Sequence, residues 1–77
     1  MITFSRILNK YYNSDNDSVV YVSNMLQAQR YLKNGAVDEL VDILYTDTKR
    51  DDSLVFVFLK TPRIKELYKK WQNHELN

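Results

Sequence analysis

The sequence contains no cysteine, one glycine and one proline among its 77 residues. The absence of cysteine excludes disulfides and thiolate metal sites, and it favours a reducing compartment. No apolar run approaches the roughly 20 residues that a membrane-spanning helix needs. The first six residues lack a basic segment followed by an unbroken apolar one, so no signal peptide is expected. These shortages predict a cytoplasmic protein that has no membrane partner.

The net charge of +1 does not by itself predict a polyanionic partner. The charges are nevertheless unevenly distributed: residues 15–52 contain eight acidic and four basic side chains, a balance of −4, so the remainder sums to +5. Much of this basic surplus comes from Arg63, Lys65, Lys69 and Lys70 near the C-terminus. We expect either an electrostatically two-sided molecule or an ordinary mixed, solvated surface.

Six consecutive apolar residues, 54–59, are the strongest structural signal in the chain. The run is rich in β-branched and aromatic side chains, and polar residues flank it on both sides. Such a run predicts a strand that is apolar on both faces, lies in the centre of its sheet and is covered on both sides.

The segments around this run predict two more strands and two helices. Residues 19–22 are a short apolar strand, and a helix over residues 25–33 ends at Gly35. Residues 36–45 have both helical and strand periodicity, and residues 39–46 are the part that we assign to a strand. We interpret them as a strand because the central strand needs a second neighbour, with a hairpin loop over residues 47–52. Thr61 and Pro62 then mark the start of a last amphipathic helix.

Near the N-terminus, Phe4, Ile7, Leu8 and Tyr11 lie at i, i+3, i+4 and i+7, which is the spacing of one helical face. We therefore predict a helix over residues 1–12 and a polar linker over residues 13–18; a strand through residues 2–4 is the alternative.

The predicted fold is a single α+β domain of order α-β-α-β-β-α, with a three-stranded antiparallel-type sheet. The helices after the first and third strands are expected on one face of this sheet. The other face must then be covered by the N-terminal helix, a second copy or a partner.

Several short segments carry a resemblance to a known family. They are Tyr21-Val22-Ser23, Tyr31-Leu32-Lys33-Asn34-Gly35, Leu40-Val41-Asp42-Ile43, Leu54-Val55-Phe56-Val57-Phe58 and the lysine-rich last helix. Over residues 19–71 the chain resembles a family of small Firmicute and phage proteins that has no assigned function. The resemblance implies a β-α-β-β-α core and a bacterial or phage origin, hence a bacterial host cytoplasm. It implies no catalytic residue, and residues 1–18 depart from the family pattern.

The residues also give no sign of catalysis. The only imidazole, His74, lies in a charged tail with no cysteine to pair with. Asp15 and Asp17 are spaced like the start of a calcium loop, but the turn glycine and the final glutamate are missing, so a polar linker is the better interpretation. There is no glycine-rich phosphate loop. We predict no catalytic residue, no cofactor and no metal site.

Six tyrosines are the one compositional oddity. They indicate either an interaction surface, where tyrosine is enriched, or an AT-rich genome. We therefore predict a non-catalytic protein-binding module, encoded by a phage or mobile element, that binds and inhibits an unidentified host protein such as a defence or replication factor. The alternative is a nucleic-acid-binding accessory protein that uses the basic last helix.

We also expect a homodimer rather than a monomer. The candidate partner-binding or nucleic-acid-binding residues are Arg63, Lys65, Lys69, Lys70, Tyr12 and Tyr45. The candidate dimer-interface residues are Phe4, Ile7, Leu8 and Tyr11.

Overall fold

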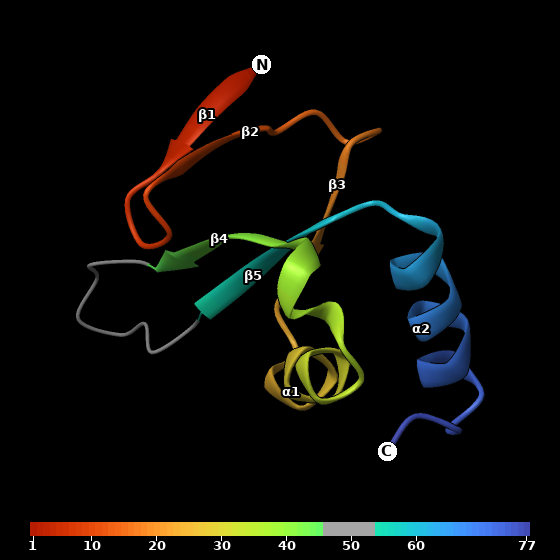
Figure 1. Cartoon of the computed structure of the whole chain (residues 1–77). Helices are drawn as coiled ribbons and strands as arrows, with labels where there is room; N and C mark the ends of the chain where they lie inside the picture. Colours follow the sequence, from red (N-terminus) through yellow and green to blue (C-terminus); the bar gives the residue numbers. More distant parts are fainter. Residues whose placement is uncertain (46–53) are drawn as a thin grey trace.

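The computed structural model describes residues 1–45 and 54–77, and within them the chain forms two antiparallel sheets and two α-helices (Figure 1). The elements in chain order are β1 (Ile2–Ser5), β2 (Lys10–Asn13), β3 (Val19–Val22), α1 (Met25–Lys33), the 3₁₀ helix η1 (Ala36–Glu39), β4 (Leu40–Tyr45), β5 (Leu54–Leu59) and α2 (Pro62–Gln72). The predicted α+β class is confirmed. The predicted loop over residues 47–52 lies outside the described residues.

The apolar run forms β5, the central strand of a three-stranded sheet of order β3-β5-β4. Both neighbours are antiparallel to it. The segment after Gly35, which has both helical and strand periodicity, contains both kinds of structure: one turn of 3₁₀ helix and then the strand β4. The prediction of a strand there is confirmed over Leu40–Tyr45.

Helix α1 begins and ends where the sequence predicts, and α2 begins where the sequence predicts. Asn24 caps α1 by accepting hydrogen bonds from the backbone N–H groups of Leu26 and Gln27. Gly35 follows α1 with a φ of 94°, a left-handed conformation that an L side chain rarely adopts. Thr61 accepts from the N–H of Ile64 at 3.3 Å, and Pro62 occupies the first turn of α2.

The two helices pack on one face of the three-stranded sheet, as expected. Phe58 on β5 and Tyr31 on α1 are the largest buried side chains there, and their rings meet edge to face with centroids 5.5 Å apart. The remaining buried members of this core are Val22, Ala28, Ala36, Leu40, Phe56, Ile64, Leu67 and Leu76.

The predicted N-terminal helix is wrong: β1 and β2 form an antiparallel hairpin. Residues 6–9 make its turn, in which the N–H of Asn9 donates to the carbonyl of Ser5 and Asn9 has a φ of 56°. The seven-residue separation of Phe4 and Tyr11, which suggested a helical face, instead places them opposite each other in the hairpin. Their ring centroids are 4.9 Å apart.

The hairpin covers the sheet face that is opposite the helices (Figure 1). Tyr12 of β2 packs there against Val19, Val41 and Val57, which come from all three strands of the sheet. The role predicted for the N-terminal segment, to cover this face, therefore falls to a pair of strands within the same chain.

The segment between the hairpin and β3 is held by hydrogen bonds and does not act as a loose linker. The N–H of Ser14 donates to the carbonyl of Met1, and the N–H of Ser18 donates to the carbonyl of Asp15, both at 2.8 Å. The Tyr21 hydroxyl donates to the carbonyl of Ser14 at 2.9 Å. These bonds fix the hairpin relative to β3.

Candidate functional site

A largely apolar groove, which we call the β3 groove, lies on the helix side of the sheet. Strand β3 borders it on one side and the two helices flank it. Its lining residues are Val20, Tyr21, Val22, Gln27, Tyr31, Lys60, Ile64, Lys65 and Tyr68. The groove therefore joins residues from four separate parts of the chain.

The size of the β3 groove limits what can occupy it. Its volume is about 220 Å³, whereas sites for drug-sized ligands and cofactors span about 300–1,000 Å³. Val20, Val22 and Ile64 give it an apolar wall, while the exposed Lys65 lies at its rim. The groove suits one or two apolar side chains with a negative group beside them.

Two polar groups of α1 line the groove beside the apolar wall. Gln27 Nε2 donates to the hydroxyl of Tyr31 at 2.8 Å. Burial raises the pKa of Tyr31, and the hydrogen bond from Gln27 opposes this shift only in part. Tyr31 is therefore neutral near pH 7, and its hydroxyl keeps a proton that it can donate to an occupant.

A second hollow continues the β3 groove toward the C-terminal end of α2. Gln27 and Tyr68 line both hollows, so the two adjoin between α1 and α2. The second hollow is more polar, and its wall includes Arg30, whose guanidinium lies 5.7 Å from the centre of the Trp71 ring.

Strand β3 also offers backbone hydrogen-bonding groups along one edge. It is an edge strand of the described sheet, paired only with β5. The carbonyl of Ser18 accepts from the N–H of Lys60, whereas the N–H of Val19 points the other way and donates to Asp15. Because the direction alternates along an antiparallel strand, the N–H and C=O of Tyr21 also point away from β5. This edge runs beside the β3 groove.

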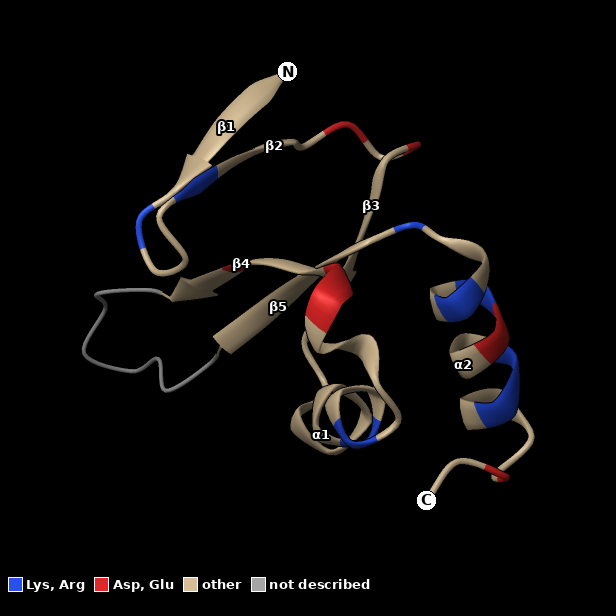
Figure 2. Ribbon diagram, viewed as in Figure 1, with Lys and Arg blue, Asp and Glu red and all other residues tan. Residues whose placement is uncertain are grey.

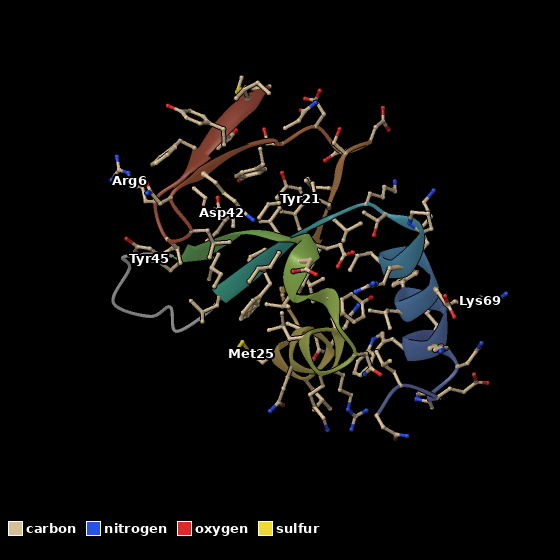
Figure 3. All side chains as sticks on the ribbon, viewed as in Figure 1. Arg6, Tyr21, Met25, Asp42, Tyr45 and Lys69 are labelled. Carbon is tan, nitrogen blue, oxygen red and sulfur yellow. The ribbon has the colours of Figure 1, made fainter. Side chains whose placement is uncertain are left out.

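The four basic residues predicted on the last helix have different roles. Arg63 donates to the carbonyl of Gly35 at 2.6 Å and pairs with Glu39 at 3.7 Å, so it joins α2 to η1. Lys70 pairs with Glu66 at 3.6 Å on the helix surface. Lys65 borders the β3 groove, and the side chain of Lys69 points outward from α2 (Figure 3). Basic and acidic positions are mixed along α2 (Figure 2). The structure does not bring the four cations together as one free basic stripe.

The predicted aromatic contact residues are also separated. Tyr12 is only 7% exposed and lies in the core, so its prediction as a surface contact is wrong. Tyr45 is exposed at the end of β4, which is the opposite edge of the sheet from β3. Of the predicted dimer residues, Phe4, Ile7 and Tyr11 are exposed on the hairpin, whereas the half-buried Leu8 packs against the helix-side core.

Asp42 is the only buried carboxylate of the described residues, and it lies between β4 and the hairpin (Figure 3). Its Oδ1 accepts from Ser5 Oγ at 2.6 Å and from the N–H of Ile43 at 2.8 Å. Its Oδ2 accepts from the Tyr12 hydroxyl at 2.7 Å. This serine–aspartate pair does not form an active site, because Ser5 is fully buried and out of reach of a substrate. The cluster joins the hairpin to the sheet.

A β-bulge brings Asp42 to this cluster. Leu40 pairs with Phe58 and Asp42 pairs with Val57, so the pairing of β4 with β5 shifts between them. The bulge places Val41 and Asp42 both on the hairpin side. Strict alternation would instead have placed the carboxylate beside Leu40, in the apolar helix-side core.

Within residues 1–45 and 54–77, no group of three or more histidine, aspartate or glutamate side chains is arranged to hold a metal ion. No described helix has the length and apolar character needed to cross a membrane. His74 follows α2 with a φ of 58° and lies in the wall of the second hollow.

No known family, curated protein or solved structure matches this chain. The resemblance to small Firmicute and phage proteins therefore stays a prediction. Several lining residues of the β3 groove, Tyr21, Gln27, Lys60 and Tyr68, were not among the predicted site residues. The tyrosine count indicated an interaction surface, but it could not say which tyrosines would lie together.

Proposed function

We propose that this chain is a small, non-catalytic protein-binding module that holds a segment of a partner protein in the β3 groove. The observation that carries the proposal is an apolar groove beside the β3 edge, where no strand of the described residues pairs with Tyr21. Apolar surface and free backbone groups together suit a polypeptide ligand better than a small molecule, since a peptide supplies both kinds of contact. The partner we propose is a host protein that a phage or mobile-element product inhibits in the bacterial cytoplasm.

A display library of host-protein fragments, selected on the immobilised full chain, tests this proposal. Enriched fragments are measured again on two single variants. Val20→Arg places a long charged side chain in the groove, whereas Val37→Arg changes an exposed residue of η1 outside it. We expect Val20→Arg to weaken binding at least tenfold and Val37→Arg to leave it unchanged. Fragments that bind both variants equally, or a selection that enriches none, would contradict the proposal.

Nucleic-acid binding through α2 is the second candidate function, and the exposed cations Lys65 and Lys69 favour it. Neither forms an ion pair with a described residue, unlike Arg63 and Lys70. Two free lysines predict a shallow salt dependence, with log K falling by about 1.4 per tenfold rise in salt for a single strand. Fluorescence anisotropy of a 20-nucleotide single-stranded DNA at several salt concentrations measures this slope. Binding that is lost in Lys69→Glu but retained in Val20→Arg would favour this function over the first.

A further inference from the structure

The geometry points to a specific mode of binding: we infer that the β3 edge takes an extended segment as an additional antiparallel strand, and that this segment carries an acidic side chain next to Lys60 and Lys65. The inference rests on the proposed protein-binding function and names its ligand class. It follows from the register of β3, the side chains of the groove and the position of its two lysines.

The backbone groups of Tyr21 provide the pairing. They point away from β5, because Ser18 and Lys60 form a hydrogen-bonded pair and the bonding direction alternates from there along β3. An incoming strand lies about 4.8 Å from β3, and its residue opposite Tyr21 exchanges both hydrogen bonds with it. Antiparallel addition is favoured because its bonds are more stable per residue than those of a parallel pair.

The groove selects the side chains on either side of that central residue. Residues of the incoming strand opposite Val20 and Val22 point to the helix side, where Ile64 and Tyr68 complete an apolar wall. A groove of about 220 Å³ accommodates small apolar side chains at these two positions. The segment therefore has an apolar residue, any residue and a second apolar residue in sequence.

The preference for an acidic residue in the ligand comes from Lys60, which pairs with Ser18 at the start of β3. The added strand pairs with β3 through Tyr21 and no further toward Ser18, because the outward N–H of Val19 already donates to the carbonyl of Asp15 at 3.2 Å. Beyond its second apolar residue the ligand therefore turns away from β3, and its acidic residue, two positions on, lies beside Lys60. Lys60 and Lys65 both line this groove, and no described acidic residue lines it with them. The complete pattern is apolar–any–apolar–any–acidic, read from the N-terminus of the ligand.

A blocked synthetic peptide of sequence Thr-Val-Thr-Val-Thr-Glu-Thr is the probe for this pattern. It is titrated into the ¹⁵N-labelled full chain and compared with three matched peptides. One has lysine in place of glutamate, one has the order of residues reversed, and one is N-methylated at the threonine between the two valines. N-methylation removes the donor to the carbonyl of Tyr21 without changing a side chain.

We expect the parent peptide to bind and the N-methylated peptide to bind about five- to tenfold more weakly, the factor typical of one lost hydrogen bond with a residual steric effect. The lysine peptide and the reversed peptide should each bind about threefold more weakly or worse, the change in affinity expected when one partly exposed ion pair is lost. Lys65→Glu should invert the preference between the glutamate and lysine peptides, whereas Lys69→Glu, outside the groove, should retain it.

Three results would overturn the inference. The first is a failure of the parent peptide to bind at millimolar concentration, and the second is equal affinity of the parent and N-methylated peptides. The third is occupation of the edge by a second copy of this chain, seen as a dimer that the parent peptide does not dissociate. Each of these leaves the Val20→Arg test of protein binding intact. A fragment that binds the groove as a helix would keep the proposed function and end the strand-addition mode.

Discussion

Tyr12 donates its phenolic hydroxyl to Asp42 Oδ2 at 2.7 Å, and this bond joins the N-terminal hairpin to β4 across 30 residues of sequence. Both side chains are buried, at 7% and 4% exposed. A buried carboxylate is stable only when hydrogen bonds replace its hydration, and Asp42 accepts three. The hairpin therefore stays on the sheet through polar contacts as well as through the apolar contacts of the Tyr12 ring.

Tyr12→Phe should destabilise the protein by about 1.5–3 kcal/mol, the contribution typical of a hydrogen bond to a charged group. The matched control is Tyr11→Phe, because Tyr11 is 72% exposed and its hydroxyl bonds to no described residue. We expect no measurable change in the control. Urea unfolding measures both free energies, and equal stabilities of the two variants would show that the Tyr12–Asp42 bond contributes nothing.

Stability should also fall at alkaline pH because of Tyr12. Burial, followed by the hydrogen bond to Asp42 and the negative charge of Asp42, raises the pKa of Tyr12 well above its ordinary value. The folded protein then holds a proton that the unfolded chain loses near pH 10, so the stabilising contribution is complete below that pH and declines above it. The slope from one such group is about 1.4 kcal/mol per pH unit.

Urea unfolding between pH 8 and 11 measures this decline, and Tyr12→Phe supplies the reference. Burial raises the pKa of Tyr31 too, so the wild-type protein and the variant should both lose stability. The wild-type slope should be steeper by the contribution of Tyr12. Identical slopes in the two proteins would mean that Tyr12 titrates alike in the folded and unfolded states.

Gly35→Ala should destabilise the protein by about 1–2 kcal/mol, because a left-handed φ is costly for an L side chain. The added Cβ would also lie 3.1 Å from Arg63 Nη1. Gly35→Asn is the matched variant, since it adds the same Cβ but tolerates the left-handed region better. Thermal unfolding should rank glycine above asparagine and asparagine above alanine. An alanine variant as stable as the wild type would contradict the φ of 94° at this position.

The N-terminal hairpin has an exposed apolar surface through which the homodimer predicted from the sequence can form. The hairpin covers the open face of the sheet, so that face no longer requires a second copy. Phe4 and Tyr11, however, pack edge to face on the outer side of the hairpin, with Ile2 exposed nearby. We predict that two copies associate through this outer face, and that Phe4→Ser together with Tyr11→Ser converts the dimer to a monomer. Light scattering at several concentrations measures this, and a wild-type protein that is monomeric throughout would exclude the dimer.

The sequence predicts the elements that consist of a continuous apolar run and those that begin or end with standard helix caps. The run at β5 and the caps Asn24, Thr61 and Gly35 are signals contained within a few residues. The hairpin was missed because its inward-facing residues Ser5 and Tyr12 are polar and their partner, Asp42, is far away in sequence. The periodicity of apolar residues gives no information about such polar contacts. One local signal was present: Asn9 lies between the two short strands, and asparagine favours a left-handed turn conformation.

The candidate site was less predictable than the fold for a related reason. The β3 groove depends on which strand lies at the edge and on how α1 and α2 approach each other, and neither follows from local pattern. Lys65 was predicted as a binding residue, and that role stays a prediction. Its neighbours in the groove, Gln27 and Tyr68, are brought beside it only in the folded chain.

The most direct test of the β3 groove as the binding surface is a chemical-shift map of the full chain with a selected host-protein fragment. Backbone amide spectra of the ¹⁵N-labelled protein are recorded at increasing fragment concentration. We expect the largest changes at Val20, Tyr21 and Val22 of β3 and at Gln27 and Tyr68 of the flanking helices. Changes that are largest at Phe4 and Tyr11, with β3 unperturbed, would contradict it.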